Sequence, residues 1–176
     1  MPEAFYASAM ENTQTKKYAK GERILILGEA SPFVHVITSG WVKLFRETFD
    51  GEEVVIDVMS EGSFFGEEGL FNEGVCSYGA EAVQDTQVIM IPRQALADEV
   101  ARKDSSLALN ILKCMMRKKN AQDMEVEHRT AQSAPQRIGC FLLKTCKPSQ
   151  GPAVLRLPYD KSVVAARLGM QPETFS

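Results

Sequence analysis

Cysteine and histidine are the side chains of this chain best suited to metal binding or nucleophilic chemistry, and their spacing argues against both uses. The four cysteines are Cys76, Cys114, Cys140 and Cys146, and no two of them form the CxxC pair that is typical of zinc and redox sites. Cys140 and Cys146 are six residues apart, which is the wrong spacing for a shared metal on one helix face. The sequence also lacks a nucleophile–base pairing, a metal triad and a Walker loop. It therefore predicts neither a metal site nor an enzyme.

The segment 160–176 carries a different kind of chemistry, the recognition of base edges. Two short helices are expected there, the second beginning at Pro172. Gly169 lies where the chain must turn, and Ala165 is small enough for two steeply crossing helices to touch. The pattern predicts a helix-turn-helix, and an αα-hairpin that only packs is the alternative. Its apolar inner face would be formed by Val164, Leu168, Met170 and Phe175.

The charges of the chain are divided unevenly between its two parts. Residues 1–100 contain 7 basic and 17 acidic side chains, a net charge of −10, whereas residues 101–176 contain 13 and 6, a net charge of +7. A basic part joined to an acidic part suggests contact with nucleic acid. A solvated charged helix beside an acidic domain would give the same numbers, so charge alone leaves both interpretations open.

Strands and turns are expected up to about residue 91. A short helix is predicted over 2–18, before the first strand. Asp50-Gly51 between two strand patterns indicates a hairpin, because the turn requires positive φ. Several short strands with glycine turns, not interrupted by a crossover helix, predict a β-sandwich or barrel. The expected strands are 23–26, 33–38, 41–46, 54–58 and 86–91.

Helices are expected after Pro92. A short helix over 93–101 would be followed by a long one over about 104–132, which contains neither Gly nor Pro. Its first half is rich in Leu, Ile and Met, so a second copy of the same helix in a homodimer would bury it. Packing on its own β domain is the alternative.

Composition places the chain among ordinary globular proteins. Of its 176 residues, 44% are hydrophobic and 24% are charged, which excludes disordered and disulfide-scaffold classes. No run of about 18 apolar residues predicts a membrane span. The first residues lack the pattern of a signal peptide, so a cytoplasmic protein with reduced thiols is expected.

Short motifs occur in a fixed order along residues 20–176. They are Lys20-Gly21-Glu22, Gly28-Glu29, Ser39-Gly40-Trp41-Val42-Lys43, Gly62-Ser63-Phe64-Phe65-Gly66-Glu67, the long helix, Gln136-Arg137-Ile138 and Gln171-Pro172-Glu173-Thr174-Phe175-Ser176. In order and spacing they resemble the CRP/FNR superfamily of bacterial transcription regulators. The resemblance implies an α+β fold with an N-terminal β jelly-roll barrel of the cyclic-nucleotide-binding type, a long dimerisation helix and a C-terminal winged helix-turn-helix. It also implies a homodimer that binds a palindromic operator.

The family's base-reading residues fall on the start of the second helix of the helix-turn-helix. Carried over, they are Gln171, Glu173, Thr174 and Ser176. A Glu accepting from a cytosine amino group is sound major-groove chemistry. The family's next residue is commonly an Arg, and the given chain ends before it. We therefore expect a regulator truncated within its DNA-binding part, which as given binds DNA poorly.

The resemblance also implies an effector pocket. Its candidate residues are Gly66, Glu67, Glu68, Cys76, Ser77, Tyr78, Gln122 and Asp123. In the family's cyclic-nucleotide binders an Arg-Ser pair holds the phosphate, and here Cys76 stands where the Arg belongs. Losing that guanidinium removes a contact of roughly 1.5–3 kcal/mol. Cyclic AMP is therefore not the expected effector.

Other cofactors follow from the same resemblance. An iron–sulfur sensor needs clustered N-terminal cysteines, which are absent. Haem stays open, with His35 and His128 as the available imidazoles, although both are expected to be structural or solvated. The effector is unknown.

The predicted domains are residues 1–103 (N-terminal helix and sensor barrel), 104–132 (dimerisation helix) and 133–176 (partial helix-turn-helix domain). The predicted function is a DNA-binding transcription regulator gated by an effector. The alternative is a free-standing sensor that dimerises without binding DNA. Salt-dependent DNA binding separates the two hypotheses.

Overall fold

The computed structural model describes residues 13–101, 109, 112–113, 115–120, 123–124, 131–145, 157 and 159–175. The chain divides into two compact units, Met1–Leu112 and Lys113–Ser176, and each unit is described by itself.

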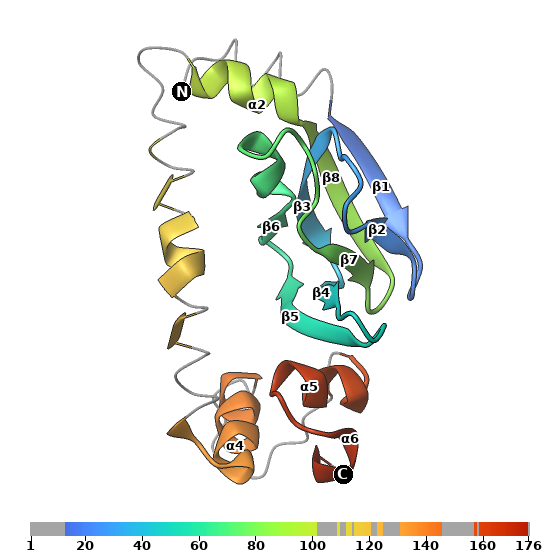
Figure 1. The fold of residues 1–176 in the computed structure, drawn as a ribbon, viewed down its shortest axis with the longest axis vertical. Helices are drawn as coiled ribbons and strands as arrows, with labels where there is room; N and C mark the ends of the chain where they lie inside the picture. Colours follow the sequence, from blue (N-terminus) through green and yellow to red (C-terminus); the bar gives the residue numbers. More distant parts are fainter. Residues whose placement is uncertain are drawn as a thin grey trace. The chain divides into compact units, whose positions relative to one another are not determined.

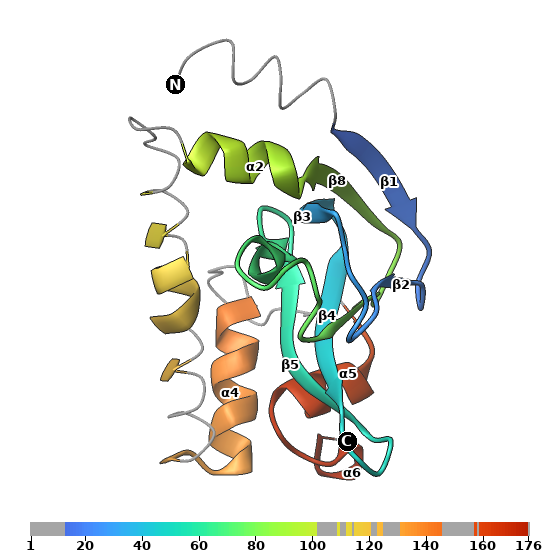
Figure 2. The ribbon, with the colours of Figure 1, turned by 45° about the horizontal axis from the view of Figure 1, so that its top comes forward.

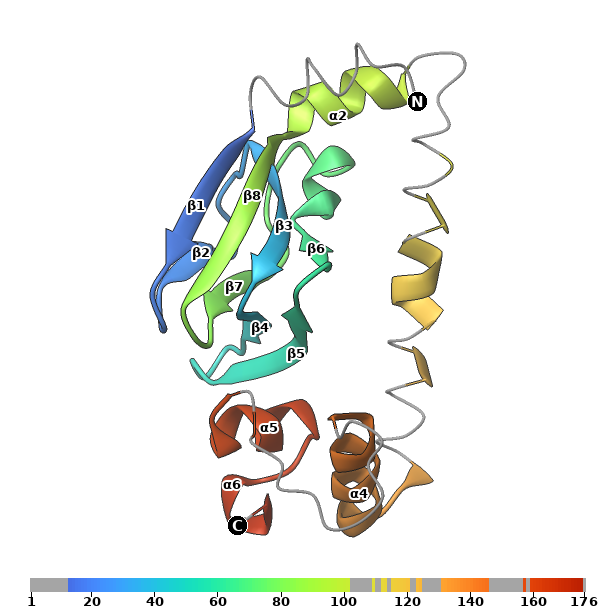
Figure 3. The ribbon, with the colours of Figure 1, turned by 180° about the vertical axis from the view of Figure 1, so that it is seen from behind.

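Two antiparallel sheets of four strands each form unit 1 within residues 13–101 (Figure 1). The first sheet has the order β1 (Gln14–Tyr18), β8 (Thr86–Pro92), β3 (Phe33–Ser39), β6 (Phe64–Phe65). The second has the order β2 (Arg23–Leu25), β7 (Gly79–Ala82), β4 (Trp41–Glu47), β5 (Glu53–Ser60). Figure 3 shows β8 between β1 and β3 in the first sheet.

Both sheets contribute to one hydrophobic core. Apolar side chains recur at alternate positions on strands, so one face of each sheet can be buried. Burial of that area is the main favourable term in folding. The core residues are Tyr18, Leu25, Ile37, Val42, Leu44, Met59, Phe65, Tyr78, Ala80, Ala82 and Val88. The α+β class is therefore confirmed, whereas closure of the sheets into a jelly-roll barrel stays a prediction.

The hairpin predicted at Asp50-Gly51 is confirmed. Strands β4 and β5 pair from Trp41 opposite Ser60 to Glu47 opposite Glu53. Gly51 has a φ of 80°, a left-handed conformation that favours glycine.

The helix predicted over residues 2–18 is wrong in its last part. Gln14–Tyr18 forms β1, which pairs in register with β8 from Gln14 opposite Met90 to Tyr18 opposite Thr86. Hydrogen bonding to a strand some 70 positions away overrides the local preference. Residues 1–12 lie outside the described part of the chain.

One end of unit 1 carries its helical elements. The short 3-10 helix η1 (Glu67–Leu70) and α2 (Arg93–Val100) lie next to each other there, as the views in Figures 1 and 2 agree. Strand β8 leads directly into α2. The strand-rich chain thus changes to helix at Pro92, as expected.

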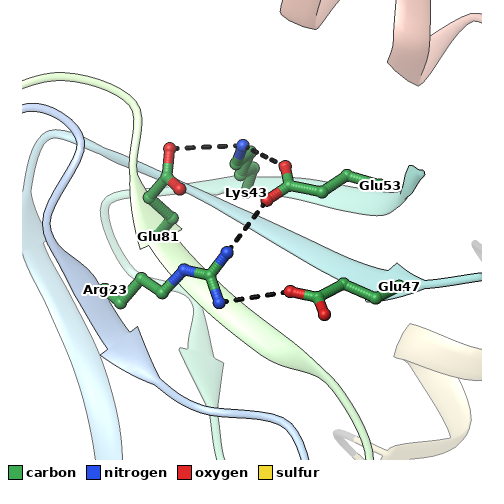
Figure 4. Close-up of polar contacts among 5 residues, drawn as sticks. All are labelled: Arg23, Lys43, Glu47, Glu53 and Glu81. Atoms are coloured by element: carbon green, nitrogen blue, oxygen red, sulfur yellow. Dashed lines mark hydrogen bonds and ion pairs between the residues drawn. The ribbon is translucent and has the colours of Figure 1, made fainter. Parts of the chain in front are cut away.

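The outer face of the second sheet carries a network of charged side chains (Figure 4). Glu53 accepts from Lys43 at 2.7 Å and from Arg23 at 3.3 Å. Lys43 also pairs with Glu81 at 3.2 Å, and Arg23 with Glu47 at 3.2 Å. These contacts link side chains of β2, β4, β5 and β7 across the sheet.

Unit 2 contains the helices α4 (Ala134–Thr145), α5 (Lys161–Arg167) and α6 (Pro172–Phe175). Within the predicted helix 104–132, positions 109, 112–113, 115–120, 123–124 and 131 are helical and 132 is a bend, and the remaining positions lie outside the described residues. Leu109, Leu112 and Met116 are half exposed there. Among the described residues, no helix is both long and apolar enough to cross a membrane.

Candidate functional site

A left-handed turn at Gly66 begins the candidate effector site. Gly66 has a φ of 83° and precedes η1. Its N–H donates to the Tyr78 hydroxyl oxygen at 2.8 Å. A Cβ atom at this position would lie 3.2 Å from the Phe33 carbonyl oxygen and 3.3 Å from Nδ1 of His35. Conformation and close packing thus both favour glycine.

Distant residues hold both η1 and the segment that follows it. Cys76 exchanges backbone hydrogen bonds with the 28–29 loop: its N–H donates to the Glu29 carbonyl, and its carbonyl accepts from Gly28, each at 2.9 Å. Arg93 of α2 donates to the Gly69 carbonyl at 2.7 Å. The turn is therefore fixed by residues far away in sequence.

Arg46 holds the next part of this segment. It is an exposed residue of β4, and its Nε donates to the Ser77 carbonyl oxygen at 3.1 Å. The sequence analysis missed Arg46 and Arg93, because nothing in the local pattern of either residue points to a partner 24 to 31 positions away.

Acidic side chains dominate the electrostatics of the site. The Ser77 hydroxyl donates to the Glu68 carboxylate, and Glu67 is buried. Burial, followed by the charge of Glu68, raises the pKa of the Cys76 thiol. Burial, followed by the charge of Glu67, raises the pKa of Tyr78. Thiol and phenol therefore stay neutral at pH 7.

The structure brings together most of the residues predicted for this pocket. Gly66, Glu67, Glu68, Cys76, Ser77 and Tyr78 interact within one turn region of unit 1. Gln122 lies outside the described residues. Asp123 is an exposed helical residue of unit 2 that pairs with Lys119. The assignment of these residues to an effector stays a prediction.

His35 lies in the core and does not fit a haem ligand. It is 2% exposed, and its ring stacks on Phe65 with 5.0 Å between ring centroids. Burial, followed by the charge of Lys16, lowers the pKa of His35 to about 4. A haem could reach this imidazole only by displacing core side chains. His128 lies outside the described residues.

Metal coordination finds no support within the described residues, where no three His, Cys, Asp or Glu side chains are placed to hold an ion. Of the four cysteines, Cys76 and Cys140 are described as free thiols. Cys114 and Cys146 lie outside the described part.

The predicted helix pair is present in unit 2. Ala165 is fully buried, Gly169 has a φ of 62°, and the Met170 N–H donates to the Ala165 carbonyl at 3.0 Å. Arg137 of α4 donates to the carbonyl oxygens of Leu168 at 2.6 Å and Gly169 at 3.2 Å. The turn between α5 and α6 is thus fixed by a small residue, a glycine and a guanidinium.

The candidate base-reading residues lie on the second helix of this pair and just before it. Gln171, Glu173 and Thr174 are exposed, and Phe175 is half buried. Ser176 lies outside the described residues. The geometry leaves three polar side chains free to contact a ligand from solvent, and their role in DNA binding stays a prediction.

Comparison with known proteins gives consistent matches. The family described as the cyclic nucleotide-binding domain matches residues 15–103. The cyclic AMP receptor protein of Thermus thermophilus is 28% identical over 168 residues, which cover 96% of this chain and 76% of the relative. The nitrogen fixation regulation protein FixK of Rhizobium meliloti is 30% identical over 159 residues, which cover 90% and 70%. The solved structure of FixK2 from Bradyrhizobium japonicum shares the fold, with a TM-score of 0.79 at 22% identity over 93% of this chain and 80% of that one.

Proposed function

The chain belongs to the CRP/FNR family of transcription regulators, which carry a cyclic nucleotide-binding domain, and from this premise we propose a sequence-specific DNA-binding regulator gated by an effector in unit 1. The members of this family are regulators and not enzymes. The proposal has three parts, which concern DNA, the dimer and the effector.

The observation that carries the DNA part is the fixed turn between α5 and α6. Ala165 is fully buried, Gly169 has a positive φ, and Arg137 donates to two backbone carbonyls of the turn. This leaves Glu173 and Thr174 exposed on α6. A rigid helix pair with exposed polar side chains suits entry into the major groove, and the net charge of +7 in residues 101–176 favours approach to phosphates.

Base reading by this helix would use hydrogen bonds at its first turn. Glu173 would accept from a cytosine amino group, and Gln171 and Thr174 would contact neighbouring bases or phosphates. Ser176 suits a phosphate. A bidentate or charge-assisted base contact contributes about 1–3 kcal/mol of discrimination.

Dimerisation would place two such helix pairs on a palindromic site. The predicted dimer helix 104–132 has half-exposed Leu109, Leu112 and Met116 at spacings of three and four residues, the spacing in sequence that favours one apolar face of a continuous helix. A second copy of this helix would remove that apolar face from water.

The effector would bind beside η1 and is not expected to be cyclic AMP. Cys76 occupies the place of the phosphate-binding Arg in the family's nucleotide binders, and the Ser77 hydroxyl is already bonded to Glu68. The residues present therefore do not fit a cyclic phosphate. An effector of another class would shift the equilibrium between two arrangements of the dimer helices and so of the two reading helices.

Selection of DNA from a random library tests the regulator proposal. The protein is expressed from its complete coding sequence and should enrich a palindromic site. Its affinity should fall steeply with salt, because phosphate contacts release counterions. Glu173→Ala should relax the preference at one base pair of each half-site, whereas Asn120→Ala, at an exposed position, should not. A protein that enriches no sequence would refute DNA reading and favour a sensor that only dimerises.

A further inference from the structure

The contact between Ser77 and Glu68 is the unusual feature of the site beside η1. The Ser77 hydroxyl donates to a carboxylate oxygen of Glu68, nine positions earlier in the chain. Both residues are only partly exposed. A hydrogen bond to a charged acceptor is about twice as strong as a neutral one, so this hydroxyl is not readily released to a ligand.

Several carboxylates lie around this contact. Glu67 is buried on the same short helix, and Glu29 and Glu68 both raise the pKa of the Cys76 thiol. The two cations described nearby are engaged with the backbone, since Arg46 donates to the Ser77 carbonyl and Arg93 to the Gly69 carbonyl. An anion entering beside Ser77 would meet the Glu68 carboxylate, while both guanidinium groups are already held by backbone carbonyls.

We propose that Glu68 determines ligand specificity by occupying the Ser77 hydroxyl with its own carboxylate, so that the site excludes anions, cyclic nucleotides among them, and accepts an uncharged or cationic effector. This inference rests on the proposed effector site in unit 1. Like-charge repulsion and the loss of the hydroxyl donor act together, because one side chain causes both.

The position of Glu68 also predicts that the missing arginine is not the only obstacle to binding of an anionic ligand. An Arg introduced at position 76 would lie near Glu68, whose charge already acts on the Cys76 thiol. The guanidinium would pair with that carboxylate before it could pair with a phosphate. Removal of Glu68 and introduction of the Arg should therefore increase the affinity for cyclic AMP more together than the sum of their separate effects.

Titration calorimetry with cyclic AMP on the full chain, without DNA, tests this directly. Wild type, Cys76→Arg and Glu68→Ala should bind weakly. The double variant C76R/E68A should bind roughly 10- to 100-fold more tightly than either single variant, the gain expected for one charge-assisted contact to a phosphate. The matched control is C76R/E61A, which removes the same charge from an exposed position and should behave like C76R alone.

Two results would overturn the proposal. They are micromolar binding of cyclic AMP by wild type, and binding by a folded C76R/E68A no tighter than by C76R. Thermal unfolding establishes that each variant is folded. If C76R/E68A unfolds early, C76R/E68Q keeps the shape of the side chain and takes its place. The assay contains no DNA, so its failure leaves the DNA-binding proposal standing, and failed DNA selection leaves this inference intact.

Discussion

Two glycine turns carry the candidate functions, and they are stabilised in different ways. Gly66 has a φ of 83° and bonds to Tyr78, twelve positions away, beside His35 of another strand. Gly169 has a φ of 62°, and its own N–H donates to Ala166 within the same helix end. The Gly66 N–H is bonded to a distant side chain, whereas the Gly169 N–H is bonded within its own helix end and Arg137 of α4 holds the carbonyl side of that turn.

The two turns also differ in the side chains that surround them. The turn at Gly66 is surrounded by buried or half-buried ionisable groups, whose charge depends on burial. The turn at Gly169 places its polar side chains on the exposed side and keeps its apolar side chains inside. Unit 1 should therefore respond to changes in charge, and unit 2 to changes in packing volume.

The largest expected effect is the pH dependence of unit 1 through His35. Its folded pKa of about 4 lies below the ordinary value of 6.5, so folding favours the neutral imidazole. The stability is fully present above pH 6.5 and is lost as pH falls toward 4, by about 3 kcal/mol in total. Urea unfolding followed by fluorescence of Trp41, the single tryptophan, measures this in unit 1.

His35→Phe is the matched variant, because it keeps a ring against Phe65. Carboxylates titrate equally in both proteins, so only the difference between them reports His35. The stability of wild type relative to H35F should drop between pH 7 and pH 4. If the free energies of unfolding of wild type and H35F changed in parallel with pH, burial would not lower the pKa of His35.

Overpacking at Ala165 should have the next largest effect. This side chain of α5 is fully buried, and Ala165→Leu forces extra volume into a packed interior at a cost of about 2–3 kcal/mol. Hydrogen exchange over residues 161–175 should accelerate, while the Trp41 transition of unit 1 stays unchanged. Ala131→Leu, at an exposed position, is the control. An equal loss of hydrogen-exchange protection in the Ala165→Leu and Ala131→Leu variants would contradict close packing around Ala165.

The same distinction explains what the sequence could predict. The hairpin at Gly51 depends on neighbours in the chain, so its local pattern predicts it. The local pattern around Ala165 and Gly169 predicts the helix pair as well, although it does not reveal that Arg137 of α4 also holds this turn. The local sequence predicts helix for the residues of β1, because nothing in it reveals the partner strand β8 about 70 positions away. Strand β7 (Gly79–Ala82) was missed, because glycine and alanine have low strand propensity and only close packing of the sheets selects them.

The family pattern predicts the candidate effector residues, of which Gly66, Glu67, Glu68, Cys76, Ser77 and Tyr78 lie in one turn region, and their assignment to an effector stays a prediction. The lost guanidinium at Cys76 is visible in the sequence. The hydrogen bond between Ser77 and Glu68 is not, since it depends on how η1 turns back against the 74–78 segment.

Substituting the two glycines compares the turns directly. Gly66→Ala should cost about 2 kcal/mol, because it combines a left-handed φ with close approach to the Phe33 carbonyl and His35. Gly169→Ala should cost only the conformational part, about 1 kcal/mol. Urea unfolding of G66A, followed by Trp41, and of G169A, followed by far-UV circular dichroism, measures both. A larger loss in G169A would reverse the proposed order.

The smallest expected effect concerns acidic side chains that water already solvates. Glu47 pairs only with Arg23 in the network of Figure 4, and both side chains are more than 40% exposed. Glu53 contacts Arg23 and the largely covered Lys43, so it holds three strands together. We expect Glu47→Gln to cost less than about 0.5 kcal/mol and Glu53→Gln about 1 kcal/mol, both reduced by salt. Urea unfolding at low and high ionic strength measures this. If E47Q lost as much free energy of unfolding as the protonation of His35 costs, exposed charges would matter to unit 1 as much as buried ones.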